Sequence, residues 1–272
     1  MSHNREQFQS DKKLKRKVLA RVISQKEIAP NIFDMRLETE LAKEAKPGQF
    51  IGVYTKDRSM LLPRPISICL SDGEKNQIRI VYRVAGQGTK EFSAYRPGDD
   101  VEILGVLGNG FPLKESRKVF LMGGGIGIPP ILGLAAALAG QKDKSESHII
   151  LGYRDDSMFL KEEFEQYGTV HIATEDGSFG TKGNVMDAIR EQGLGADIIY
   201  ACGPMPMLRA IKNYAEEKNI PAYISLEERM ACGVGACLGC VVKTREIDHH
   251  SHVNNARICT DGPVFEAKEV EI

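Results

Sequence analysis

The chain has 272 residues, of which 42% are hydrophobic and 27% are charged, and its formal net charge is −1. This length can hold two moderate domains and a small additional module. The near balance of charges gives no reason to expect a nucleic-acid partner.

The N-terminal segment and one uncharged run bear on cellular location. Residues 1–15 are polar and basic and lack the apolar core of an export signal, so we expect a flexible tail and a cytoplasmic protein. Residues 119–141 carry no charge over a length that can span a membrane, but they include six glycines and two prolines. We therefore expect a strand, a tight loop and a short buried helix there, and no membrane contact.

Residues 16–114 show short alternating runs separated by Gly, Pro or Asp. Such spacing is typical of an antiparallel barrel or sandwich, and we predict one such domain over this range. The expected strands are 16–24, 32–38, 49–55, 64–70, 78–84 and 99–108.

Two features in this range can bind a phosphorylated cofactor. Arg64 lies on an otherwise apolar strand, where its guanidinium can fork onto phosphate, or it is simply an exposed edge residue. Ser67 can form a hydrogen bond with the edge of a flavin or with a backbone group. Gly88 and Thr89 can hold a pyrophosphate or close a turn.

Residues 115–224 alternate between buried-type strands and helices, which predicts a parallel sheet with helices on its faces. The expected strands are 118–124, 147–153, 169–176, 196–204 and 221–227, and the expected helices are 129–140, 159–168, 185–193 and 207–219.

A glycine loop, "GGGIGIPP", follows the first of these strands and precedes a helix. Glycines there let a diphosphate approach the backbone at a helix N-terminus. The dinucleotide fingerprint requires a third glycine where this chain has Pro130, so a plain strand-to-helix turn is an equal alternative. The candidate nucleotide-binding residues are Gly123, Gly124, Gly125 and Gly127.

Residues 225–272 hold four cysteines with the spacing C-x4-C-x2-C-x18-C. The first part is the plant-type spacing for a [2Fe–2S] cluster, and Gly233, Gly235 and Gly239 permit the tight loop that a cluster needs. Zinc is the alternative, although zinc sites usually show two C-x2-4-C knuckles. The predicted ligands are Cys232, Cys237, Cys240 and Cys259.

The remaining cysteines and a histidine run have structural interpretations as well as functional ones. Cys69 is expected in the core, and Cys202 either positions a nicotinamide ring or is a buried inert thiol. His249, His250 and His252 favour an exposed loop over a metal site.

Taken together, the R-P-x-S strand at 64–67, the later G-T, the G-G-x-G-x-x-P loop and the C-G-P at 202–204 resemble the ferredoxin–NADP reductase superfamily. With the C-terminal cysteine module, the chain after its tail resembles the electron-transfer subunits of type B dihydroorotate dehydrogenase. The resemblance implies FAD on the barrel, NAD on the α/β domain and a [2Fe–2S] cluster facing an FMN-containing catalytic subunit. The FAD contacts that it implies are Arg64, Pro65, Ile66, Ser67, Val81, Tyr82, Arg83, Gly88 and Thr89.

The resemblance further implies that electrons pass from the partner's FMN through the cluster and FAD to NAD+ in pyrimidine biosynthesis, within an assembly of two copies of each subunit. Alternatives are a stand-alone or different-complex NAD(P)H:ferredoxin or sulfide-type reductase subunit, and a non-catalytic iron–sulfur redox sensor. In the sulfide-type relatives an aspartate replaces the first cluster cysteine, so Cys232 favours the pyrimidine pathway.

Two pairs of neighbouring acidic residues bear on the nucleotide preference and on the flavin site. NADH is expected to be preferred, because Asp155 and Asp156 would repel a 2′-phosphate, although Arg154 can attract one. Glu227 and Glu228 are typical of solvated charges, although the resemblance places their segment near the flavin.

Overall fold

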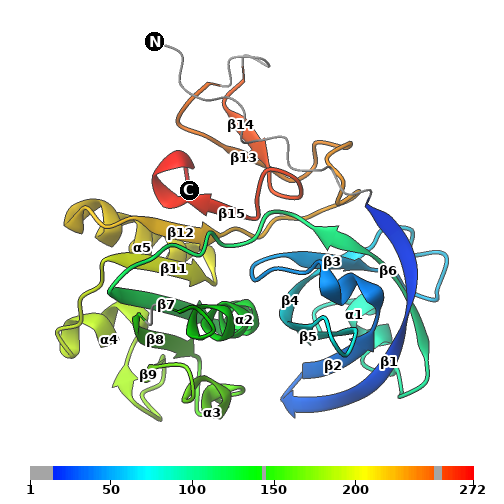
Figure 1. Ribbon diagram of the computed structural model, residues 1–272, viewed down its shortest axis with the longest axis horizontal. Coiled ribbons are helices and arrows are strands. Elements are labelled where there is room, and N and C mark those ends of the chain that lie inside the picture. The colour runs from blue at the N-terminus through cyan, green and yellow to red at the C-terminus, as the bar shows by residue number, and fades with distance from the viewer. Residues whose placement is uncertain (1–14, 143–144, 248–252) are drawn as a thin grey trace.

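The computed structural model describes residues 15–142, 145–247 and 253–272. An antiparallel barrel and an α/β sheet lie side by side, and the C-terminal segment lies across one end of both (Figure 1). This arrangement confirms the predicted fold class. The predicted tail lies almost entirely outside the described residues. No helix within them is long and apolar enough to cross a membrane.

Six strands close into a barrel in the order β1-β2-β5-β4-β3-β6, with β6 pairing back onto β1. Closure decides between the two expected architectures in favour of the barrel. Its interior is filled by aliphatic side chains such as Met35, Ile51, Ile80 and Ile103, all fully buried. The strands are β1 (Arg16–Ala29), β2 (Ile32–Glu38), β3 (Phe50–Val53), β4 (Arg64–Asp72), β5 (Gln77–Arg83) and β6 (Asp100–Leu107).

Two short helices interrupt the barrel: η1 (Glu40–Lys43), with Thr39 at its N-cap, and α1 (Gln87–Phe92). The helix α1 occupies the G-T segment, which was expected to hold a pyrophosphate or to close a turn. It begins at Gly86, and the Thr89 hydroxyl accepts the Gly86 N–H at 3.1 Å, so a threonine in the first turn supports the helix.

The second layer is a seven-stranded sheet in the order β10-β9-β8-β7-β11-β12-β15. The chain leaves β7 toward β8 and later returns to its other side as β11, which creates a switch point where ligands bind in open α/β sheets. Every pairing is parallel except that of the last strand. The strands are β7 (Lys118–Gly124), β8 (Glu146–Tyr153), β9 (Thr169–Thr174), β10 (Thr181–Lys182), β11 (Ile198–Cys202), β12 (Ala222–Ser225) and β15 (Val264–Glu266).

Alternate residues of β7 supply two cores on opposite faces of the sheet. Val119 and Leu121 pack with α2, whereas Phe120 and Met122 pack with α4 and α5. The helices are η2 (Gly125–Gly127), α2 (Ile128–Ala139), α3 (Lys161–Phe164), α4 (Val185–Glu191) and α5 (Met205–Lys218). The expected helix over 159–168 is a single turn, preceded by Leu160 at φ 65° and anchored by the buried Phe164.

The barrel and the sheet meet where α2 packs on β4, as Figure 1 shows. A Cβ on Gly133 of α2 would lie 2.3 Å from the carbonyl oxygen of Cys69, so only glycine permits this approach. Cys69 is fully buried there, as predicted.

The C-terminal segment has more regular structure than its sequence indicates. It contains a hairpin, β13 (Val241–Lys243) and β14 (Asn255–Arg257), followed by β15 and η3 (Ala267–Glu269). Strand β15 pairs antiparallel with β12, placing Phe265 opposite Ile224. Strand β15 thereby joins the C-terminal segment to the seven-stranded sheet, whereas β13 and β14 form a separate two-stranded sheet.

Candidate functional site

A cavity of about 310 Å³ lies between the barrel and the C-terminal segment. Eight of the nine residues expected to contact FAD line it, which brings β4, β5 and α1 to one surface. They are Arg64, Pro65, Ile66, Ser67, Val81, Tyr82, Arg83 and Thr89.

The ninth residue, Gly88, acts from behind this surface. A Cβ at Gly88 would lie 2.2 Å from Nε of Arg64, so the glycine leaves the space in which the guanidinium rests. Arg64 Nη1 donates to the carbonyl of Leu62 at 2.5 Å. The Thr89 hydroxyl accepts the N–H groups of Ala85 and Gly86, at 2.9 and 3.1 Å, so it closes the turn while lining the cavity.

The opposite wall of this cavity includes the segment of Glu227 and Glu228, which the resemblance placed near the flavin. It consists of Ile126 from the glycine loop, the segment 225–230 that leads to the cysteines, and Pro263. The Leu226 N–H donates to the Pro263 carbonyl at 2.9 Å, which fixes the wall. Burial raises the pKa of Glu227 in this wall, and the charge of Arg83 opposes the shift. The two glutamates therefore line the cavity rather than a purely solvated face.

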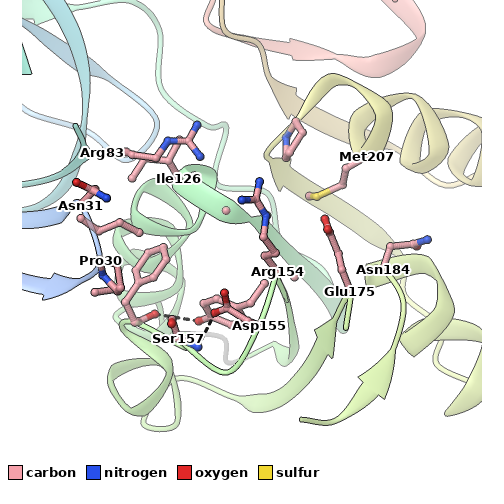
Figure 2. A pocket seen from close by; sticks show the side chains of 18 of the residues that line it. Pro30, Asn31, Arg83, Ile126, Arg154, Asp155, Ser157, Glu175, Asn184 and Met207 are labelled. Carbon is pink, nitrogen blue, oxygen red and sulfur yellow. Dashed lines mark hydrogen bonds between the residues drawn. The ribbon is translucent and has the colours of Figure 1, made fainter. Parts of the chain in front are cut away.

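A second cavity, of about 510 Å³, opens at the carboxyl ends of β7, β8 and β9 (Figure 2). Gly124 and Gly125 of the predicted nucleotide loop line it. Gly123 and Gly127 do not, because they serve packing. A Cβ on Gly127 would lie 2.4 Å from the Cys202 carbonyl oxygen, and one on Gly123 would lie 3.0 Å from the Ile128 side chain.

Charged groups gather at one side of this second cavity. Figure 2 shows Arg154 and Glu175 next to one another, with Asp155 lower in the wall. Asp155 accepts the Ser157 N–H at 2.9 Å. Asp156, which was expected to act with Asp155, is not among the lining residues. Glu175 was not predicted from the sequence, although an acidic residue directly after the strand "TVHIAT" was the available signal.

The two cavities share Arg83 and Ile126 in their linings. Arg83 ends β5 and Ile126 lies in η2, so one residue from each domain forms the junction. A ligand in either cavity therefore reaches toward a ligand in the other.

Cys202 lies at the end of β11, 1% exposed and outside both linings. Burial raises the pKa of its thiol well above the usual range, the nearby Glu227 adds to this, and a hydrogen bond with Ser225 opposes it. Both expectations for Cys202 stand as predictions, and its burial favours the inert thiol.

Cys232, Cys237 and Cys240 lie on one loop before strand β13, and Cys259 lies just after strand β14. Cys240 and Cys259 are 2% and 1% exposed, whereas Cys237 is exposed. The loop turns through left-handed conformations at Gly233 (φ 68°) and Gly235 (φ 83°), which glycine adopts without strain.

Backbone N–H groups in this loop point at sulfur. Val234 and Ala236 donate to Cys232 Sγ at 3.4 and 3.3 Å, and Gly239 donates to Cys237 Sγ at 3.4 Å. Burial opposes ionisation of Cys232, but these N–H groups and Cys237 outweigh it and lower its pKa to about 6. The loop therefore stabilises negative charge on sulfur, as thiolate ligands require.

The pairing of the cysteines tests which metal group fits. Cys237 is the thiol that most affects the pKa of Cys232, and Cys240 is the one that most affects the pKa of Cys259, so the thiols group as two pairs. Within the described ranges, no three His, Cys, Asp or Glu side chains gather around a single metal ion. Two pairs suit a two-iron cluster better than one tetrahedral zinc. The histidine run at 249–252 lies outside the described residues.

Comparisons with known proteins agree with this geometry. The model for the iron–sulfur cluster binding domain of dihydroorotate dehydrogenase B matches residues 227–271, and the oxidoreductase NAD-binding domain matches residues 121–213. The chain is 44% identical over 255 residues to the electron transfer subunit of dihydroorotate dehydrogenase B (NAD(+)) of Shouchella clausii, covering 92% of this chain and 96% of that protein. The corresponding subunit of Bacillus cereus strain B4264 is 44% identical over 254 residues, with the same coverage.

Solved structures show the same architecture. The NADH-dependent reduced ferredoxin-NADP oxidoreductase, studied for flavin-based electron bifurcation, superposes with a TM-score of 0.84 at 29% identity, covering 93% of this chain and 90% of that chain. A flavohemoglobin from Malassezia yamatoensis, with bound FAD and heme, has a TM-score of 0.62 at 22% identity, covering 75% and 57%. The second likeness shows the fold alone.

Proposed function

The chain belongs to the family of dihydroorotate dehydrogenase B electron transfer subunits, and we propose that it links dihydroorotate oxidation in a catalytic partner to reduction of NAD+. When bound, FAD, the [2Fe–2S] cluster and NAD+ supply the redox chemistry, the cluster carrying electrons singly and the flavin exchanging them in pairs with the nicotinamide. The chain's own residues bind these groups, orient them and set the distances between them.

One observation carries the proposal: a single continuous segment connects the barrel cavity to the cysteine loop. Met230 lines the barrel cavity, and Cys232 follows two residues later. Two residues of extended chain span at most about 7 Å, so a group held by Cys232 lies next to one held in that cavity. Arg83 and Ile126 join the same cavity to the nucleotide cavity.

We assign the barrel cavity to FAD. Arg64 supplies a guanidinium for the pyrophosphate, with space provided by Gly88, and β4 and β5 supply the surface for the ring. The remaining proposed FAD contacts are Pro65, Ile66, Ser67, Val81, Tyr82, Arg83 and Thr89.

We assign the second cavity to NAD. Gly124 and Gly125 let its phosphates approach the backbone, and Glu175 lies where a 2′-phosphate of NADPH would be repelled. Gly123 and Gly127 support this loop by close packing rather than by ligand contact.

We assign the cluster to the four clustered cysteines as two pairs, Cys232 with Cys237 and Cys240 with Cys259. The N–H groups directed at Cys232 and Cys237 stabilise the thiolates. The proposed division of the chain gives each cofactor one region: residues 16–114 for FAD, 115–224 for NAD and 225–272 for the cluster.

The family name of an electron transfer subunit implies a catalytic partner subunit. We propose that this partner contains FMN, that two copies of each subunit assemble in the cytoplasm, and that the partner docks over the cysteine loop. Three exposed apolar side chains on and beside that loop support this docking face: Val234 (41% exposed), Leu238 (62%) and Val241 (41%).

Cofactor analysis of the purified chain tests the proposal. We expect about one FAD and two irons with acid-labile sulfide per chain, together with NADH oxidation by an artificial acceptor. A chain that retains zinc without sulfide, or that binds no flavin, would contradict it.

A further inference from the structure

A partly buried ion triad connects the barrel to the α/β domain. Arg79 of β5 donates from Nε and Nη2 to the Asp34 carboxylate of β2, at 3.0 and 2.8 Å. From Nη1 and Nη2 it donates to the Glu163 carboxylate of α3, at 2.5 and 2.8 Å. The side chains of Arg79 and Asp34 are 7% and 16% exposed, so water screens this pair little, whereas the Glu163 side chain is 40% exposed.

The two carboxylates have different roles. Strands β2 and β5 are antiparallel neighbours, with Asp34 opposite Val81 and Arg36 opposite Arg79, so the Asp34 contact is a diagonal cross-strand pair within the barrel. Asp34 thus offsets the repulsion between the two arginines and orients Arg79. Of these three residues, only Glu163 belongs to the α/β domain.

These ion pairs add little net stability, because desolvation of Arg79 and Asp34 offsets their attraction and water screens the 40% exposed Glu163. A guanidinium that is bidentate to two carboxylates does fix both distance and angle. The triad is therefore better suited to setting the orientation of the domains than to strengthening their contact. The apolar packing of α2 on β4, at Gly133 and Cys69, supplies the contact itself.

The triad lies on the strand that leads to the cavity junction. Residues 79, 81 and 83 of β5 face the same side, because side chains alternate along a strand. Val81 lines the barrel cavity, and Arg83 lines both cavities. Four residues of strand span about 13 Å, so a tilt of about 5° at Arg79 displaces the junction by about 1 Å.

We propose that Arg79 and Glu163 are positioning residues, which hold the α/β domain at the angle that brings the nucleotide cavity into register with the flavin cavity at Arg83. This inference rests on the proposed function, since exchange between NAD and FAD is the step that requires the register. A displacement of about 1 Å in reacting geometry can reduce a rate by about a hundredfold.

The test uses the FAD-loaded full chain with NADH and ferricyanide. Glu163→Gln removes the charge on the domain-bridging side, and Glu162→Gln, one position away in α3 and exposed, is the matched control. Arg79→Met removes the whole triad. Each variant is measured for kcat, for KM of NADH, for FAD content, and for hydrogen–deuterium exchange of residues 128–139, a readout that does not depend on turnover.

We expect Glu163→Gln to lower kcat about threefold and Arg79→Met about tenfold, with KM and FAD content within about twofold of wild type. Exchange in α2 should rise in both variants, and Glu162→Gln should match wild type. Should Arg79→Met fail to fold, Glu163→Gln decides alone. An unchanged kcat for Glu163→Gln, or a loss that only follows FAD loss, would overturn the inference. Failure of the wild-type chain itself to oxidise NADH would instead refute the proposed function.

Discussion

Cys240 and Cys259 are held together by the start of the β13–β14 hairpin, where the Ile258 N–H donates to the Cys240 carbonyl oxygen at 2.8 Å. Both side chains are buried, and each approaches the other's sulfur closely enough to raise the pKa of Cys259 to about 11, with burial as the larger cause. The two cysteines therefore lie at the two ends of the β13–β14 hairpin, although 18 residues separate them in the sequence.

Substitution of one cysteine tests the metal assignment. Cys237→Ser removes an exposed ligand from the first pair, and we expect the iron content to fall from about two per chain to near zero, with loss of the cluster absorbance. Cys69→Ala is the control, since Cys69 is buried between β4 and α2 and should leave the iron content unchanged. Retention of both irons in Cys237→Ser would contradict the ligand assignment.

Substitution of Arg64 tests the flavin assignment. Arg64→Ala removes a guanidinium from the barrel cavity, and we expect FAD binding to weaken by about 2–5 kcal/mol if the charge contacts a desolvated phosphate. FAD retention after gel filtration, followed by titration of the released flavin, measures the loss. Arg58→Ala, in the exposed loop before β4, should retain FAD fully. Equal FAD contents in both variants would show that Arg64 is an edge residue.

Glu175 tests the nucleotide preference. We expect wild type to prefer NADH to NADPH, and Glu175→Gln to reduce the ratio of the two kcat/KM values about tenfold, because a carboxylate at the cavity opening repels a 2′-phosphate. Asp156→Asn is the matched control, since Asp156 lies outside the cavity lining. Comparable kcat/KM values for both nucleotides in wild type would contradict this account.

The raised pKa of Glu227 predicts that the stability of the folded chain depends on pH. Its pKa is raised in the folded chain, so the folded state binds this proton more tightly than the unfolded state. Stability is then lost as pH rises from the unfolded pKa, about 4.3, through the folded pKa. We expect Glu227→Gln to raise Tm at pH 7 and to match wild type near pH 4. A gain of equal size at both pH values would rule out titration as its cause.

The sequence predicted most of the fold because its local signals were unambiguous. The alternating runs gave all six barrel strands, and the strand at 118–124 was predicted to the residue. The helix over 159–168 was wrong in length, because tertiary anchoring of Phe164 and the αL conformation of Leu160 restrict it to one turn. Periodicity alone carries no information on such anchoring.

The candidate site was predictable only in part, for a related reason. Motifs located one wall of the barrel cavity, but the opposite wall comes from Leu226, Met230 and Pro263, which have no chemical signature. Likewise, strand β15 is only three residues long, and its pairing with β12 is a long-range contact. Of the glycine loop, only Gly124 and Gly125 reach the nucleotide cavity, since spacing does not distinguish ligand contact from packing.

The exposed apolar residues of the cysteine loop test the docking face. Leu238 is 62% exposed at φ 56°, and we expect Leu238→Arg to reduce NAD+-linked dihydroorotate turnover with the catalytic partner about tenfold, since it places a charge in an apolar interface. NADH–ferricyanide activity of the same variant should remain at the wild-type level. Ile23→Arg, on barrel strand β1, is the control and should affect neither assay. Equal losses in both assays would place the effect within the chain rather than at the interface.

The most direct test of the central claim is turnover of dihydroorotate with NAD+ by the isolated chain and by the chain mixed with an FMN-containing dihydroorotate dehydrogenase catalytic subunit. The two cavities that meet at Arg83 and Ile126 are assigned to FAD and NAD, and the four clustered cysteines to the cluster, so neither of these cavities is left for dihydroorotate. We predict NADH oxidation with ferricyanide but no dihydroorotate oxidation by the isolated chain, and NAD+-linked dihydroorotate oxidation upon mixing. Dihydroorotate turnover by the chain alone, or a mixture that stays inactive, would contradict the account.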